Sequence, residues 1–128
     1  MTLLIATDYV ADATITYGID RTAHDADMPH KVAVAISLQL PSVPAGTGRV
    51  HTDTVWVAPI GDETDAELRH KGFVAFLSFL SAAAEAYAAG MRGLESDNGS
   101  LFPADVMEWA YINSDAIEMA HGDEEDMS

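Results

Sequence analysis

The 128-residue chain has no cysteine and very few basic residues. Without cysteine it can form no disulfide, no thiolate nucleophile and no cysteine-ligated zinc site. Lys and Arg together number 6 against 21 Asp and Glu, which gives a formal net charge of −15 at pH 7. Such a charge repels nucleic acid and anionic membranes, so we expect neither as a direct partner.

We also expect neither a targeting segment nor a membrane span. The first eight residues have no positive n-region and only a short apolar run, so we expect a cytoplasmic protein. Residues 72–91 are long enough to cross a bilayer and carry one charge, Glu85. They are rich in Ala and Ser and lack a basic flank or aromatic belts at both ends, so we interpret them as a buried helix.

Length and patterning fit one folded domain. Apolar residues make up 48% of the chain, enough for a substantial core. Apolar residues alternate with period two in the first half and recur with helical periodicity in the second. We therefore predict a single α+β domain over residues 1–122, an antiparallel β-sheet meander of three or four strands followed by two C-terminal helices packed on it. The acidic run 123–128 is expected to be a disordered tail.

Alternation also predicts which side chains share a face of the sheet. Odd residues from Leu3 to Ile19 are mostly apolar and even ones mostly polar, so we expect the odd set on the buried face. Residues 32–40 and 49–58 read as further strands. The opposite face is small and polar, typical of a sheet that is wet on one side. We place His51 and Asp53 on that wet face.

Two helices are predicted after the strands. The segment Thr64-Asp65-Ala66-Glu67 fits a capping box and predicts the start of a long helix that ends at Gly90 or Gly93. A second helix is expected from about Pro103 to His121, with a break at residues 113–115 as the alternative.

The long helix is apolar on more sides than one sheet can cover. We therefore predict a homodimer with its contact at Phe79, Ala82 and Ala86, where small residues would let two helices approach closely. The alternative is that the second helix of the same chain covers this side.

Two Glu-x-x-His pairs have a spacing that places metal ligands on one helix face: Glu67 with His70, and Glu118 with His121. Simpler roles account for them. Glu67 belongs to the capping box, and a histidine at a helix C-terminus interacts favourably with the helix dipole.

A loop that contains His24 and His30 with two Asp between them is a third candidate, and a solvated polar loop is its simpler interpretation. We predict no metal and no cofactor. Phosphate-loop, dinucleotide, GxSxG and HExxH motifs are absent as well, and we expect no enzymatic activity.

The most pronounced feature is the acidity of the second half. After Arg92 the chain has ten Asp and Glu and no Lys or Arg. We predict that a partner binds the acids on this side of the molecule, which are Glu95, Asp97, Asp105, Glu108, Asp115 and Glu118. Dense negative charge is also what a DNA duplex presents, at about one charge per 1.7 Å of axis. Such a surface would compete for Lys- and Arg-lined grooves, with fast and salt-sensitive association.

In size, charge and lack of catalytic motifs, the chain is similar to small acidic proteins of phages and mobile elements that imitate DNA, including inhibitors of restriction and CRISPR systems. The resemblance implies a non-enzymatic inhibitor that occupies the basic nucleic-acid-binding surface of a protein partner. The alternative is a self-associating structural or assembly protein whose acidity serves solubility or salt adaptation.

Overall fold

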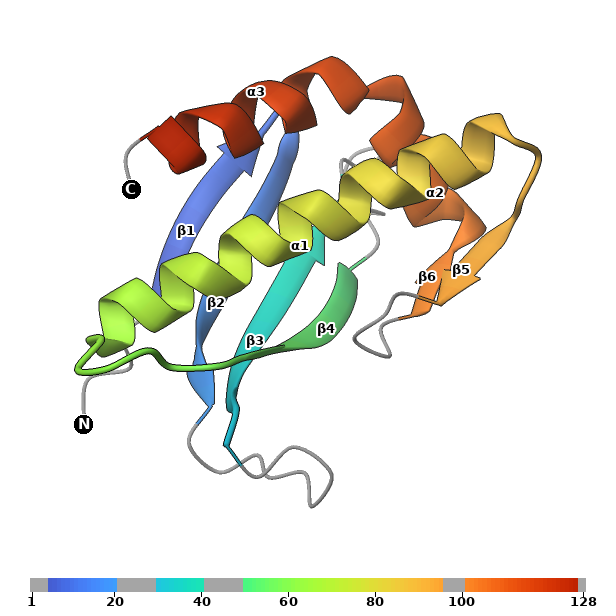
Figure 1. The fold of residues 1–128 in the computed structure, drawn as a ribbon. Coiled ribbons are helices and arrows are strands. Elements are labelled where there is room, and N and C mark those ends of the chain that lie inside the picture. The colour runs from blue at the N-terminus through green and yellow to red at the C-terminus, as the bar shows by residue number, and fades with distance from the viewer. Residues whose placement is uncertain (1–4, 21–29, 41–49, 96–100, 127–128) are drawn as a thin grey trace.

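The chain folds into two layers, a four-stranded sheet and a layer of helices on one of its faces (Figure 1). The computed structural model describes residues 5–20, 30–40, 50–95 and 101–126, the last five of these by their backbone alone. Within these ranges, no helix is long and apolar enough to cross a membrane.

The sheet is an antiparallel meander, as the alternation predicted. Its strands pair in sequence order. They are β1 (Ile5–Val10), β2 (Ala13–Asp20), β3 (Val32–Gln39) and β4 (Val50–Val57). Helices follow and pack on this sheet, so the predicted α+β class is confirmed.

The predicted buried face is right for β2 but wrong for β1. Ile15 of β2 pairs with Leu38 of β3, and both are fully buried beneath the helices. A turn of two residues joins β1 to β2 and pairs Val10 with Ala13, so paired residues have opposite parity. The even residues of β1 therefore face the helices, and the odd residues Ile5 and Tyr9 are 55% and 75% exposed.

The predicted position of His51 and Asp53 on the wet face is also wrong. These residues of β4 pair with Leu38 and Ile36, which point toward the helices, so both side chains share that inner face. The physical reason is register: the alternation of β4 is correct, but its polar residues at the start of the strand occupy the inner positions.

Helix α1 (Asp65–Ala88) begins and ends where the sequence indicated. The predicted capping box is present, with the Glu67 backbone N–H donating to Thr64 Oγ1 over 3.2 Å. At the other end Gly90 adopts a φ of +98°. The N–H of Met91 then donates to the Ala86 carbonyl over 3.0 Å, which satisfies an otherwise unpaired carbonyl of the last turn.

Close contact with β3 explains a glycine inside α1. A Cβ at Gly72 would lie 2.6 Å from Val34 Cβ, so only glycine lets the helix lie this close to the sheet. One residue later, the Phe73 ring stacks on Tyr17 with centroids 4.4 Å apart. Phe76, three residues further along the helix, is fully buried as well.

The predicted second helix is divided in two, as the alternative had it. Helix α2 (Ala104–Ile112) ends at Asn113, whose side-chain amide donates to the Trp109 carbonyl, and α3 (Ser114–Asp126) follows at once. Helix α3 continues past residue 122, where the acidic tail was expected to begin. Before α2, the short strands β5 (Gly93–Glu95) and β6 (Leu101–Pro103) form a hairpin that the sequence did not indicate.

Helices α2 and α3 lie beside α1 in the helical layer and pack against its flank (Figure 1). The sequence indicated that α1 packs against something besides the sheet, and these two helices of the same chain provide that contact.

Candidate functional site

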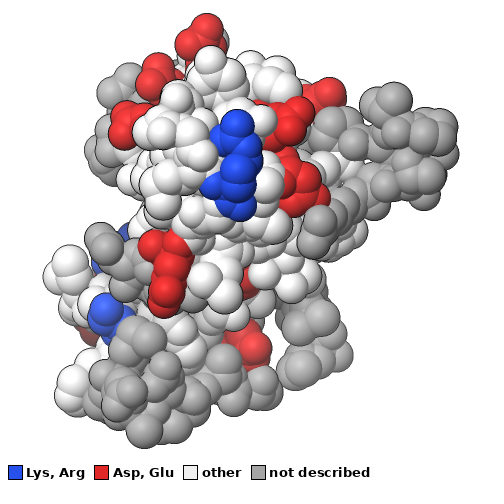
Figure 2. Space-filling view, turned by 90° about the vertical axis from the view of Figure 1, so that its right-hand side faces the viewer, with Lys and Arg blue, Asp and Glu red and all other residues white. Residues whose placement is uncertain are grey.

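The predicted acidic residues do not all join one surface. Glu108, Asp115 and Glu118 are exposed on the helical layer. Glu95 is exposed on β5, and Asp97 lies outside the described residues. Figure 2 views the molecule from the side of the β5–β6 hairpin. It shows separate acidic groups around one basic group in its upper half.

Asp105 contributes to its own helix rather than to an open surface. It is half-buried in the first turn of α2, where its Oδ1 accepts the Val106 N–H over 2.9 Å. An acidic side chain at this position also interacts favourably with the positive end of the helix. We therefore leave Asp105 out of the binding surface that the structure supports best.

Glu85 of α1 belongs to this surface in place of Asp105. Glu85 and Glu118 line one shallow hollow of about 190 Å³ between α1 and α3, together with the exposed ring of Tyr111. The Tyr111 and Tyr87 rings are 5.5 Å apart, and the Tyr87 hydroxyl donates to Glu108 over 3.3 Å.

A helical turn adds one more carboxylate. Asp115 stands three residues before Glu118, so both lie on the same side of α3. The four residues Glu85, Glu108, Asp115 and Glu118 thus follow one another across the helical layer, and we call them the acidic strip.

Arg92, the last basic residue of the sequence, lies beside Tyr87, whose hydroxyl donates to Glu108. Its guanidinium stands 4.1 Å from the centre of the Tyr87 ring and donates to the carbonyls of Tyr87 and Met91. The Tyr87 carbonyl belongs to the C-terminal end of α1, where a cation is favoured. Arg92 therefore places one positive charge beside the contact between Tyr87 and Glu108.

Metal-binding arrangements are not formed by the part of the chain that the structure describes. No group of three or more His, Asp or Glu side chains gathers there as ligands. Glu67 is engaged in the capping box at the start of α1, and His24 lies outside the described residues, while His30 is exposed beside β3. The absence of a metal stays a prediction.

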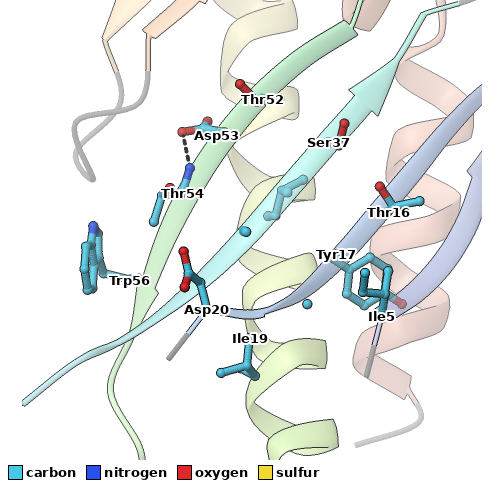
Figure 3. Close-up of a pocket in the computed structure, with 13 residues that line it drawn as sticks. Ile5, Thr16, Tyr17, Ile19, Asp20, Ser37, Thr52, Asp53, Thr54 and Trp56 are labelled. Atoms are coloured by element: carbon cyan, nitrogen blue, oxygen red, sulfur yellow. Dashed lines mark hydrogen bonds between the residues drawn. The ribbon is translucent and has the colours of Figure 1, made fainter. Parts of the chain in front are cut away.

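The outer face of the sheet forms a second hollow, of about 780 Å³ (Figure 3). Hydroxyl side chains of Thr16, Ser37 and Thr52 lie in one row across β2, β3 and β4. The small residues Gly18 and Ala35 form the neighbouring row. The described lining contains no His, Lys or Arg, so it supplies hydroxyls and carboxylates without a base of the histidine or lysine type.

His51 and Asp53 form a buried polar pair at the sheet edge beneath the helices. Their side chains are 11% and 9% exposed, with His51 Nε2 and Asp53 Oδ2 3.8 Å apart. Neither of these two atoms has a hydrogen-bond partner, while Asp53 Oδ1 accepts the Thr54 N–H. The His51 ring packs against Phe102 of β6. Inward-pointing polar side chains of this kind make an edge strand a poor template for another strand.

The predicted dimer contact lies along α1. Phe79 and Ala86 are partly buried and pack against the hydrophobic core, whereas Ala82 is exposed. The homodimer contact at these three residues stays a prediction, although its original motive is met by the helices of the same chain.

The chain matches no protein-family model, and comparison with curated proteins and with solved structures gives no match either. The chemistry and placement of its own residues must therefore support any function.

Proposed function

We propose that this is a non-enzymatic, cytoplasmic interaction protein whose acidic strip occupies the basic, nucleic-acid-binding surface of a protein partner. The observation that carries the proposal is the presence of exposed carboxylates on α1, α2 and α3, which pack together in one layer. Glu118 and Glu85 flank the hollow, Asp115 follows on the same helix side, and Glu108 is held by the Tyr87 hydroxyl.

Helices give this surface a fixed form. Carboxylates on packed helices lose less conformational freedom on binding than carboxylates on a flexible segment, so more of their interaction energy appears as affinity. Each contact with a partly desolvated Lys or Arg contributes about 1–3 kcal/mol. Complementary charge also accelerates association and makes it sensitive to salt.

The test begins with capture. The wild-type chain is immobilised and exposed to a lysate of the organism that encodes it, at low and at high salt. We expect a basic nucleic-acid-handling protein that salt elutes, and duplex DNA should compete with the immobilised chain for that protein. Capture of no such protein, or binding that DNA leaves unchanged, contradicts the proposal.

Two variants of equal charge separate a specific surface from bulk acidity. The first neutralises the acidic strip with Glu85→Gln, Glu108→Gln, Asp115→Asn and Glu118→Gln. The second neutralises four acids elsewhere in the sequence, with Asp to Asn changes at Asp12, Asp25, Asp27 and Asp62. Each variant removes four of the 15 net negative charges and has a net charge of −11. We expect both to fold, because the replaced residues that the structure describes are exposed and exposed charges add little stability.

A further inference from the structure

The two edges of the sheet differ, and the difference indicates where a second copy binds. At the β4 edge, Asp53 accepts the Thr54 N–H and lies with His51 under the neighbouring hairpin. The β1 edge has no such protection among the described residues. Its outer side chains are Ile5, Thr7 and Tyr9, all exposed. An open edge with exposed apolar side chains is a template for another strand.

The main chain of β1 is arranged for pairing on its free side. Val10 and Ala13 are the pair next to a two-residue turn, so they exchange hydrogen bonds with each other. Because hydrogen-bonded positions alternate, Ala6 and Asp8 also direct their N–H and C=O groups to β2. The N–H and C=O groups of the odd residues 5, 7 and 9 therefore point to the free edge.

We propose that the protein forms a homodimer in which two β1 strands pair antiparallel about a two-fold axis at Thr7. In this register Ile5 stands opposite the partner copy's Tyr9, and Thr7 stands opposite its own counterpart. Three such pairs exchange about six main-chain hydrogen bonds. A β-branched residue opposite an aromatic one, and Thr opposite Thr, are favourable cross-strand pairs. The carboxylate of Asp8 stands opposite Ala6, so the register opposes no like charges across the strands.

Helix α3 extends the same contact above the sheet. It packs over β1 at the outer side of the helical layer, beside α1 (Figure 1). Since Glu118 faces α1, residues two positions away lie about 200° around the axis and face away from α1. These residues are Ala116 and Ala120, which are partly buried and packed against the hydrophobic core, so the large apolar side chain that α3 leaves exposed is Met119, at 70%.

A specific interface buries about 1,200–2,000 Å², more than one strand edge supplies. The exposed side chains of Ile5, Tyr9 and Met119 supply additional apolar area. The pairing of two β1 strands uses main-chain groups and no residue of the acidic strip, so the dimer does not depend on the proposed function.

The effect of salt distinguishes the β1 dimer contact from the acidic strip. Like-charged copies repel one another, so screening should strengthen the dimer, whereas it should weaken binding at the acidic strip. Sedimentation equilibrium in about 0.5 M salt, where the Debye length is well below 10 Å, should report twice the 13.7 kDa of one chain. A mass of 13.7 kDa at concentrations up to hundreds of micromolar overturns the proposal.

Thr7 and Thr52 offer a matched pair of variants. Both are exposed, and they stand at opposite ends of one row that crosses all four strands. Thr7→Lys places two like charges at the two-fold axis and should raise the dimer dissociation constant at least about tenfold. Thr52→Lys makes the same charge change at the β4 edge and should leave the constant unchanged. Equal loss in both variants, or loss of the dimer in Ala82→Glu on α1, overturns the proposal.

Amide hydrogen exchange of the wild-type chain tests the pairing of two β1 strands without a substitution, so it applies even if Thr7→Lys fails to fold. We expect the N–H groups of Thr7 and Tyr9 to gain protection as the protein concentration rises. Those of Ala6 and Asp8, which pair with β2, should be protected at every concentration. Exchange at Thr7 and Tyr9 that is independent of concentration contradicts pairing through β1.

Discussion

The two sides of α1 are built from different chemistry. Toward the sheet, Gly72 lies against Val34 and the ring of Phe73 stacks on Tyr17, with every side chain enclosed. Toward α2 and α3, part of the surface is polar, and Glu85 is exposed beside a hollow. The first side is specified by shape and the second presents charge. Substitutions on the sheet side should therefore change stability, and substitutions on the polar side should change binding.

The largest expected effect is on the sheet side. Phe76→Ala removes a fully buried ring and should lower the free energy of unfolding by about 3–5 kcal/mol. Glu85→Ala on the polar side should change it by less than about 0.5 kcal/mol. Urea denaturation followed by circular dichroism measures both. Equal losses in the two variants would remove the distinction between the two sides.

A smaller effect tests the close approach of α1 to β3. Gly72→Ala forces a methyl group against Val34 and should destabilise the fold by about 1–3 kcal/mol, although alanine is the better helix former. Ser78→Ala, at an exposed position of the same helix, serves as control and should be neutral or slightly stabilising. A Gly72→Ala variant as stable as wild type would contradict the packing described for α1.

A substitution in the turn between β1 and β2 should stabilise the fold instead of destabilising it. Ala11 adopts a φ of +54°, a left-handed conformation that strains a residue with a Cβ. Ala11→Gly should raise the free energy of unfolding by about 1 kcal/mol, because glycine adopts this conformation without the steric cost. Ala58→Gly, at an exposed position outside the sheet, is a control that should not stabilise the fold.

The smallest expected effect concerns acid and the entry to α1. Lys71 Nζ lies 2.7 Å from Glu63 Oε1 and, with the Ile60 N–H, holds the pKa of Glu63 below its ordinary value of 4.5. A carboxyl whose pKa is lowered by folding stabilises the fold above its unfolded pKa and loses that contribution as the pH falls through the folded pKa. Glu63→Gln should therefore reduce the dependence of the melting temperature on pH below about 4.5. An unchanged profile would show that the ion pair adds no stability.

Local signals in the sequence were sufficient for the four strands of the meander and for α1, but not for the hairpin of β5 and β6. Alternation predicted the meander, and the capping box at Thr64 with Gly90 predicted the limits of α1. These signals act within a few residues, through side-chain period and main-chain hydrogen bonding. The inner face of β1 was predicted wrongly because it depends on the length of one turn, and the alternation within the strand does not contain that length.

The candidate site was harder to predict because it joins separate helices. Asp115 and Glu118 share a helix side, which spacing alone shows. Glu85 stands far away in the sequence and joins them only because α3 packs beside α1. Its one signal was a single charge within an otherwise uncharged stretch of helix. The engagement of Asp105 in its own helix start likewise depends on where α2 begins.

The central claim is that the arrangement of the acidic strip, rather than total charge, binds the partner. Its most direct test is the ratio of the dissociation constants that the two variants of net charge −11 show for the captured basic protein, measured at about 0.1 M salt. Neutralising the acidic strip should weaken binding at least about a hundredfold relative to the control variant, the equivalent of two charge contacts. A ratio close to one would contradict the claim, because it would mean that any four carboxylates contribute equally.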